Sequence, residues 1–220
     1  GIGDGTFATH ETYAVGRQPD DVAVADLNGD GHIDIVTVNW IDANVSVLLN
    51  RGGGTFAAQV TYRVGESPRS VALSDLNGDQ KVDIVAANGR DHNVSVLLGR
   101  GDGTFAPQVT YLVGTQPWGA RPMSVALADL NGDDVVDIVT SNEISDDVSV
   151  LLGHGNGTFA PYTTYAVGQD PDSVALADLN GDTYVDIVTS SYLDHDISVL
   201  LGLGDGTFAE RVTYDVGVSQ

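Results

Sequence analysis

Acidic side chains recur at one fixed spacing in four loops of the sequence. Each loop reads Asp-x-Asn-x-Asp-x-x-x-Asp, and the residue at its seventh position differs from loop to loop. Oxygen side chains at positions 1, 3 and 5, a backbone carbonyl at position 7 and the final Asp can wrap such a loop around a hard cation. We therefore predict one Ca²⁺ site in each loop, about four ions per chain. The predicted ligands are Asp26, Asn28, Asp30, His32 and Asp34; Asp75, Asn77, Asp79, Lys81 and Asp83; Asp129, Asn131, Asp133, Val135 and Asp137; and Asp178, Asn180, Asp182, Tyr184 and Asp186.

The residue types favour Ca²⁺ over other cations. Three carboxylates with neutral oxygens suit the flexible coordination of Ca²⁺ better than the strict octahedron of Mg²⁺. The chain has no Cys and no paired His near the loops, which argues against zinc and copper. An EF-hand loop needs an acidic residue at position 12, where these loops carry Thr37, Ala86, Thr140 and Thr189. The alternative is an Asx-rich hairpin turn without a cation, in which the clustered carboxylates would repel one another.

The loops belong to a long internal repeat that must position them. Asp-Leu-Asn-Gly-Asp starts at residues 26, 75, 129 and 178, and Gly-Thr-Phe places Phe at positions 7, 56, 105, 159 and 208. Each period reads as four short strands rich in Val, Ile, Thr and Tyr, separated by Gly, Asn, Asp and Pro. In the last period the expected strands are Ser173–Asp178, Val185–Thr189, Ile197–Leu201 and Phe208–Val216. A period of about 40–50 residues with four strands is typical of a propeller blade, and a sandwich is the alternative.

We therefore predict an all-β fold: a single β-propeller over residues 1–220, built from four-stranded antiparallel blades. The blades are expected at 17–65, 66–114, 115–168 and 169–217, and residues 1–16 are expected to form a lone fourth strand, one extra outer strand. A ring of six or seven blades would need about 290–340 residues at this period. Three alternatives remain: a tight four-bladed ring, an excerpt of a longer protein, or a ring shared by several chains through homo-oligomer formation or strand exchange.

Composition limits the kinds of partner. The 31 acidic and 9 basic residues give a formal charge of −22, and so acidic a surface repels nucleic acid and anionic lipid. No apolar run approaches the roughly 20 residues that cross a bilayer, so no direct membrane insertion is expected. Because the sequence begins with Gly1 rather than Met, we expect a mature or excised piece of a longer chain.

The repeated strings resemble a known family. Val-Ala-Leu-Ala-Asp-Leu-Asn-Gly-Asp, then Val-Asp-Ile-Val, then Gly-Asp-Gly-Thr-Phe is similar to the FG-GAP (VCBS) repeat of integrin α-subunit propellers and of many secreted bacterial proteins. The resemblance implies Ca²⁺ in the hairpin between the first and second strands and ligand binding on the opposite face. It also implies a secreted or cell-surface protein that acts in adhesion or binds a glycan or protein ligand. Gly53 departs from the pattern, since the matching turns have Asp or Asn.

Variation between repeats marks a candidate ligand face. The loops between the second and third strands differ most, and the five-residue insertion within 116–122 lies on the same expected face. Aromatic side chains beside Arg and His suit a glycan or peptide surface. The alternative is that Trp118 plugs the ring centre and Trp40 packs between blades. The candidate ligand-binding residues are Trp40, Arg90, His92, Trp118, Arg121, Tyr192 and His195.

The sequence favours a binding module over an enzyme. There is no nucleophile-elbow motif, and the five His residues stand at different places in the period, unlike a repeated catalytic site. No carboxylate pair outside the acidic loops suggests glycoside hydrolysis. The alternatives are an ancillary or catalytic module of a secreted carbohydrate-active enzyme and a structural spacer in a long surface protein.

Overall fold

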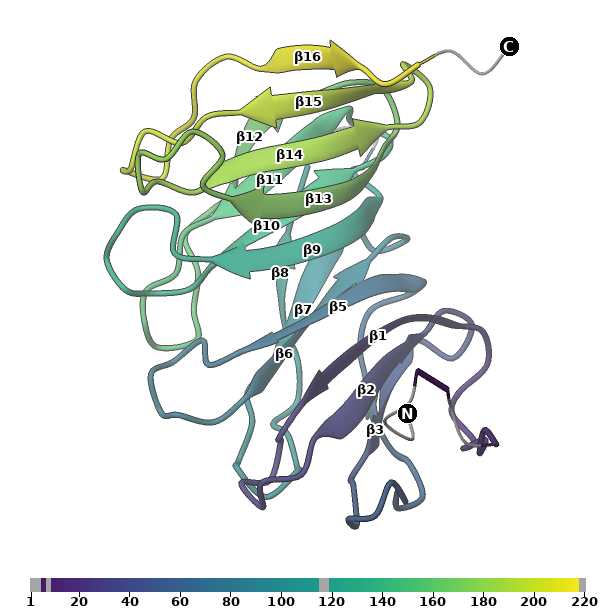
Figure 1. Cartoon of the computed structure of the whole chain (residues 1–220). Helices are drawn as coiled ribbons and strands as arrows, with labels where there is room; N and C mark the ends of the chain where they lie inside the picture. The colour runs from purple at the N-terminus through teal and green to yellow at the C-terminus, as the bar shows by residue number, and fades with distance from the viewer. Residues whose placement is uncertain (1–4, 7–8, 115–118, 218–220) are drawn as a thin grey trace.

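A computed structural model describes residues 5–6, 9–114 and 119–217. Its described residues form four sheets, each an antiparallel meander of four strands, which confirms the all-β prediction (Figure 1). The strands are β1 (Pro19–Ala25), β2 (Asp34–Asn39), β3 (Asn44–Leu48) and β4 (Val60–Arg63) in blade one; β5 (Pro68–Ser74), β6 (Asp83–Asn88), β7 (Asn93–Leu97) and β8 (Val109–Leu112) in blade two; β9 (Pro122–Ala128), β10 (Asp137–Asn142), β11 (Asp147–Leu151) and β12 (Thr163–Ala166) in blade three; and β13 (Pro171–Ala177), β14 (Asp186–Ser191), β15 (Asp196–Leu200) and β16 (Val212–Asp215) in blade four.

The core lies between successive blades. We call the side of a blade that faces the next blade its leading face, and the opposite side its trailing face. Between blades one and two, Leu27, Val36 and Val45 of the leading face pack on Val71 and Ile84 of the trailing face. The next two interfaces repeat this arrangement with equivalent residues. Stability therefore comes from contacts between neighbouring repeats, as in other repeat proteins.

Each interface also contains aromatic and glycine contacts. The Tyr62 ring meets Phe105 of the next blade edge to face, with 5.3 Å between centroids, a favourable aromatic geometry. Gly65 follows β4 and lies against the buried side chain of Asn88, so that a Cβ atom there would come within 2.7 Å of that side chain. The close approach of these chains explains why glycine recurs at this point of the repeat.

The four blades form an open arc rather than a closed ring, with blades one and four at its two ends (Figure 1). The innermost strands β1, β5, β9 and β13 contact one another in sequence order along the arc. A tight four-bladed ring within one chain is therefore not what the structure shows. None of the described residues forms a helix that could cross a membrane.

The prediction of a lone strand at 1–16 is wrong for the part that the structure describes. Residues 5–6 and 9–16 form no strand. A strand needs a hydrogen-bonded neighbour, and no third strand lies beside this segment in the described structure. The segment still follows the path of a fourth strand. Tyr13 stacks edge to face on Phe56 at 5.3 Å, and the Gly16 amide donates to Ser46 Oγ at 3.3 Å.

Candidate functional site

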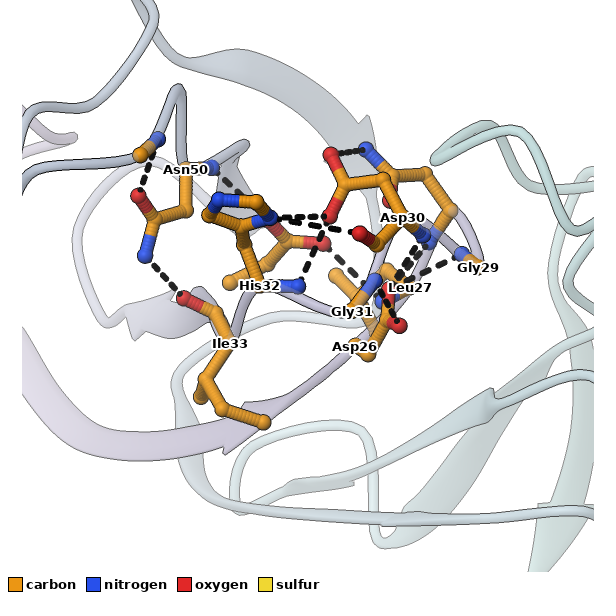
Figure 2. Close-up of polar contacts among 11 residues, drawn as sticks. Asp26, Leu27, Gly29, Asp30, Gly31, His32, Ile33 and Asn50 are labelled. Atoms are coloured by element: carbon orange, nitrogen blue, oxygen red, sulfur yellow. Dashed lines mark hydrogen bonds and ion pairs between the residues drawn. The ribbon is translucent and has the colours of Figure 1, made fainter.

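The four acidic loops are the hairpins that join the first and second strands of each blade. In blade one, both carboxylate oxygens of Asp26 accept backbone N–H groups of its own loop, including those of Gly29 and Gly31 at 2.8 Å (Figure 2). The bend that allows this passes through Gly29, whose φ of 73° lies in the left-handed region that glycine adopts without strain. Asp30 accepts the His32 amide at 2.8 Å, which completes the turn.

The last Asp of each loop has a different environment. Asp34, Asp83, Asp137 and Asp186 are all fully buried. Asp137 Oδ2 accepts the Leu130 amide at 2.9 Å and Oδ1 accepts the Gly153 amide at 2.7 Å. This carboxylate therefore ties the start of its acidic loop to the chain that follows β11. The other three blades repeat both bonds.

The pKa values of Asp26 and Asp178 shift in the opposite direction to that of the buried Asp137. The Gly31 amide and other loop amides hold the pKa of Asp26 below its ordinary value, and the Thr183 amide does the same for Asp178. Burial raises the pKa of Asp137 and the neighbouring carboxylates of the loop raise it further, although the amides of Gly153 and Leu130 lower it. Amide donors favour the charged form and burial disfavours it, so Asp26 and Asp178 are anionic at neutral pH.

The donor set of the loops fits a hard cation, but the described side chains are not gathered around one point. Every predicted side-chain ligand from Asp or Asn offers oxygen, the element that Ca²⁺ prefers. Within the described residues, no group of three acidic or His side chains is placed to hold a metal ion. The carboxylates instead face loop amides and, in blade two, an internal cation: Lys81 Nζ lies 3.2 Å from Asp79 Oδ2. The Ca²⁺ sites therefore stay a prediction.

A pocket of about 350 Å³ lies at the opposite end of the blades from the acidic loops. Its residues come from blades one to three: from the loops between second and third strands, from the start of β5, and from the segments just before β5 and β9. Its lining residues are Trp40, Ser67, Arg69, Gly89, Arg90, His92, Arg121 and Ile144. Three of the nine basic residues of an acidic chain thus meet in one cavity.

Charged and aromatic contacts fix the walls of this arginine pocket. The Arg69 guanidinium lies 5.3 Å from the centre of the Trp40 ring and forms an ion pair with Asp20 at 3.0 Å. Arg121 Nη1 donates to Glu143 Oε1 at 2.7 Å, and burial raises the pKa of Glu143 despite this arginine. Cation–π contacts and ion pairs of this kind restrict the orientation of guanidinium groups.

Some polar atoms in these walls lack a partner among the described residues. Trp40 Nε1 and Arg69 Nε are buried donors without an acceptor, and Glu143 Oε2 is a buried acceptor without a donor. Buried polar groups are nearly always hydrogen-bonded in folded proteins. The two donors belong to residues that line the pocket, and Glu143 pairs with the lining residue Arg121.

The structure brings together part of the predicted ligand face. Trp40, Arg90, His92 and Arg121 line the arginine pocket. Tyr192 and His195 lie elsewhere, in a pocket of about 510 Å³ on blade four. Trp118 lies outside the described residues.

Sequence reasoning missed Arg69, which stands at the start of β5 rather than in a variable loop. The corresponding positions hold Asp20, Met123 and Asp172. The signal that could have found Arg69 is that only this repeat carries a cation there.

The repeats seen in the structure coincide with the matches of a known family model. The FG-GAP-like repeat model matches residues 26–86, 75–140 and 137–189, so that each match begins at or near an acidic loop and ends in the second strand of the following blade. The chain belongs to the FG-GAP-like repeat family. No curated protein matches this FG-GAP-like chain.

Solved structures share its architecture. An Agrocybe aegerita lectin described as recognising non-reducing terminal N-acetylglucosamine is 25% identical, with a TM-score of 0.57 over 86% of this chain and 50% of the lectin. A Lactobacillus plantarum protein is 16% identical, with a TM-score of 0.68 over 94% and 59%. An auxiliary nutrient binding protein from Bacteroides ovatus is 14% identical, with a TM-score of 0.60 over 92% and 48%. The FG-GAP-like chain thus spans 48–59% of the length of these proteins.

Proposed function

We propose that this protein is a secreted or cell-surface propeller module that binds a saccharide in the arginine pocket and is stabilised by Ca²⁺ in the acidic loops. The observation that carries the proposal is the pocket itself, where Trp40 and three arginines meet opposite the acidic loops. An indole ring offers an apolar face for a sugar ring, and guanidinium groups offer directed donors to its oxygens. The lectin at 25% identity supports a saccharide over a peptide ligand.

The charge balance of the pocket favours a neutral saccharide. Arg69, Arg90 and Arg121 are each paired with a carboxylate, from Asp20, Glu66 and Glu143 respectively. The cations are therefore already neutralised, and a ligand carboxylate would compete with existing ion pairs. Hydroxyl groups can instead accept hydrogen bonds from the guanidinium groups without displacing a charge. We expect binding without turnover, since none of the described residues that line the pocket is an Asp or Glu, and most glycoside hydrolases need a pair of these carboxyl groups.

A glycan array tests the proposal. The wild-type chain should retain neutral glycans, and Trp40→Ala should weaken binding at least tenfold, because loss of about 1.4 kcal/mol of contact energy corresponds to that factor. Arg90→Ala should also weaken binding, since Arg90 lines the pocket with a largely exposed side chain. Arg51→Ala, on the end with the acidic loops, is the matched control and should bind like wild type. The proposal would be refuted if the wild-type chain retained no glycan, or if all four proteins bound glycans equally. Melting curves would show whether Trp40→Ala folds.

The Ca²⁺ part of the proposal has its own test. Native mass spectrometry of the wild type should show about four bound ions at saturation. Asp178→Ala should show one fewer and leave the other three sites occupied, because contacts between repeats are local. In a titration, the loop of blade two should fill last, since Lys81 already pairs with Asp79. Loss of all four ions in Asp178→Ala would contradict independent sites.

A further inference from the structure

A groove of about 520 Å³ lies between blades one and two, away from both the acidic loops and the arginine pocket. One wall is β4, the outermost strand of blade one, and the other is the connection that leads into β8 of blade two. Tyr62, Leu97 and Phe105 give the groove an apolar lining. The groove is on the side of blade one that faces blade two, so both of its walls are internal to the described arc.

The strand β4 has an unpaired edge at this groove. The Val64 amide, just after β4, donates to the Ala43 carbonyl at 3.1 Å, and the antiparallel register continues from there along β3 and β4. In such a pair the backbone groups of alternate residues point toward the partner strand and away from it. The N–H and C=O groups of Thr61 and Arg63 therefore point away from β3. Both residues line the groove, and such an edge can pair with a further strand.

Two cations also line the groove. Arg63 ends β4 and Arg100 follows β7, and both are exposed. Within the described part of the chain neither forms an ion pair, in contrast to the three paired arginines of the arginine pocket. Asp102 is close to Arg100, but its main partner is the Thr104 hydroxyl at 2.6 Å, which holds the pKa of Asp102 below its ordinary value. The groove thus offers positive charge in an otherwise acidic chain.

The equivalent positions at the other two interfaces lack this pair of cations. Leu112 and Ala166 take the place of Arg63, and His154 and Leu203 take the place of Arg100. A groove of about 420 Å³ recurs between blades three and four, where an acidic residue, Glu210, stands in its lining. The repeat therefore supplies the shape of the groove, and substitutions at two positions make the first groove basic.

We propose that the groove between blades one and two binds an extended, carboxylate-bearing peptide, which adds to blade one as a fifth strand beside β4. Edge strands bind peptides through main-chain hydrogen bonds, and pockets for alternate side chains select the sequence. An apolar side chain of the peptide packs on Tyr62 and Phe105. Residues two positions to either side point the same way, so carboxylates there meet the guanidinium groups of Arg63 and Arg100 in charge-assisted hydrogen bonds.

A peptide array tests the proposal. Each immobilised seven-residue peptide has Leu or Phe at its centre, one test residue type two positions to either side, and Ser elsewhere. The full chain is applied in about 0.15 M salt, which screens its overall negative charge. It should retain the peptides whose test residue is Asp or Glu. Those with Asn or Lys should not be retained, because Asn lacks the charge and Lys repels the arginines.

Charge-reversal variants locate the site. Arg63→Glu and Arg100→Glu should each weaken binding of the acidic peptides about tenfold or more, since each removes a hydrogen bond between charged groups. Arg51→Glu is the matched control, because Arg51 holds the position of Arg100 in blade one and its reversal changes the net charge equally. Arg51→Glu should bind the acidic peptides like wild type.

A proline variant tests the strand pairing itself. Thr61→Pro removes an N–H group that points away from β3, so it should abolish peptide binding and leave the ladder between β3 and β4 in place. Thr164→Pro makes the same change at the equivalent position of β12 and should bind like wild type. Melting curves show whether both variants fold. Acidic peptides N-methylated at alternate residues make the same test from the peptide side and should not be retained by wild type.

Three results would overturn the proposal. The first is a wild-type chain that retains no acidic peptide, or retains the Asn peptides equally well. The second is equal loss of binding in Arg51→Glu and Arg100→Glu, which would indicate an unspecific effect of charge. The third is full binding of N-methylated peptides, or full binding by Thr61→Pro, which would indicate an anion site without strand pairing.

Discussion

Asp137→Ala is expected to lower the free energy of unfolding by about 2–5 kcal/mol in metal-free buffer. The substitution leaves the buried Leu130 amide and the partly buried Gly153 amide without an acceptor, and each unsatisfied buried group costs about 1–3 kcal/mol. Removing a carboxylate whose pKa is raised by burial offsets part of this cost. Urea unfolding at neutral pH with a chelator measures the effect without any contribution from bound metal.

Two variants serve as controls for this prediction. Asp137→Asn keeps one acceptor oxygen and the shape of the side chain, so it should lose about half as much stability. Asp133→Ala removes another predicted Ca²⁺ ligand from the same loop, but Asp133 is exposed and accepts only from the Val135 backbone amide and the Asn131 side-chain amide of its own turn. It should cost less than about 1 kcal/mol. Equal losses for Asp137→Ala and Asp133→Ala would contradict a structural role for the buried carboxylate.

Adding Ca²⁺ to the chelated protein is expected to raise the melting temperature by about 5–20 °C. With dissociation constants of about 0.1–1 mM, four sites at about 1 mM Ca²⁺ add roughly 2–6 kcal/mol, and each kcal/mol shifts a domain of this size by about 2–4 °C. Four divalent ions would also reduce the formal charge from −22 to about −14, which weakens repulsion within the acidic chain. Differential scanning calorimetry with chelator, Ca²⁺ or Mg²⁺ measures the shift.

Mg²⁺ is the matched control because it has the same charge but demands stricter geometry. If charge screening alone stabilised the chain, both ions would raise the melting temperature equally. A larger shift with Ca²⁺ identifies specific sites. An unchanged melting temperature with Ca²⁺ would show that the loops are metal-free Asx turns, held by the amide contacts seen at Asp26 and its equivalents.

The sequence predicts the strands closely because they carry the repeat. In blade four, the predicted second and third strands, Val185–Thr189 and Ile197–Leu201, lie within two residues of β14 and β15. The predicted fourth strand from Phe208 to Val216 is longer than β16, since Phe208 forms only an isolated bridge with Gly202. Apolar alternation marks where a strand can lie, but hydrogen bonding decides how far it pairs.

Two features of the candidate sites lie beyond the repeat pattern. Arg69 reaches the pocket because neighbouring blades bring Trp40 and Asp20 beside it, and this proximity depends on the angle between blades. Residues 9–16 have the sequence of a fourth strand but form none, because pairing depends on a third strand that must come from elsewhere. Both features depend on contacts between repeats. The sequence of a single repeat does not predict these contacts.

The aromatic contact between Tyr62 and Phe105 joins two consecutive blades, and its equivalents join the others. Each period therefore supplies one half of its interface with the preceding period and one half of its interface with the following period. Duplication or loss of a whole period by recombination between repeats would restore complete interfaces on both sides of the junction. The number of blades can consequently change during evolution in steps of one, without any compensating substitution in the blades that remain.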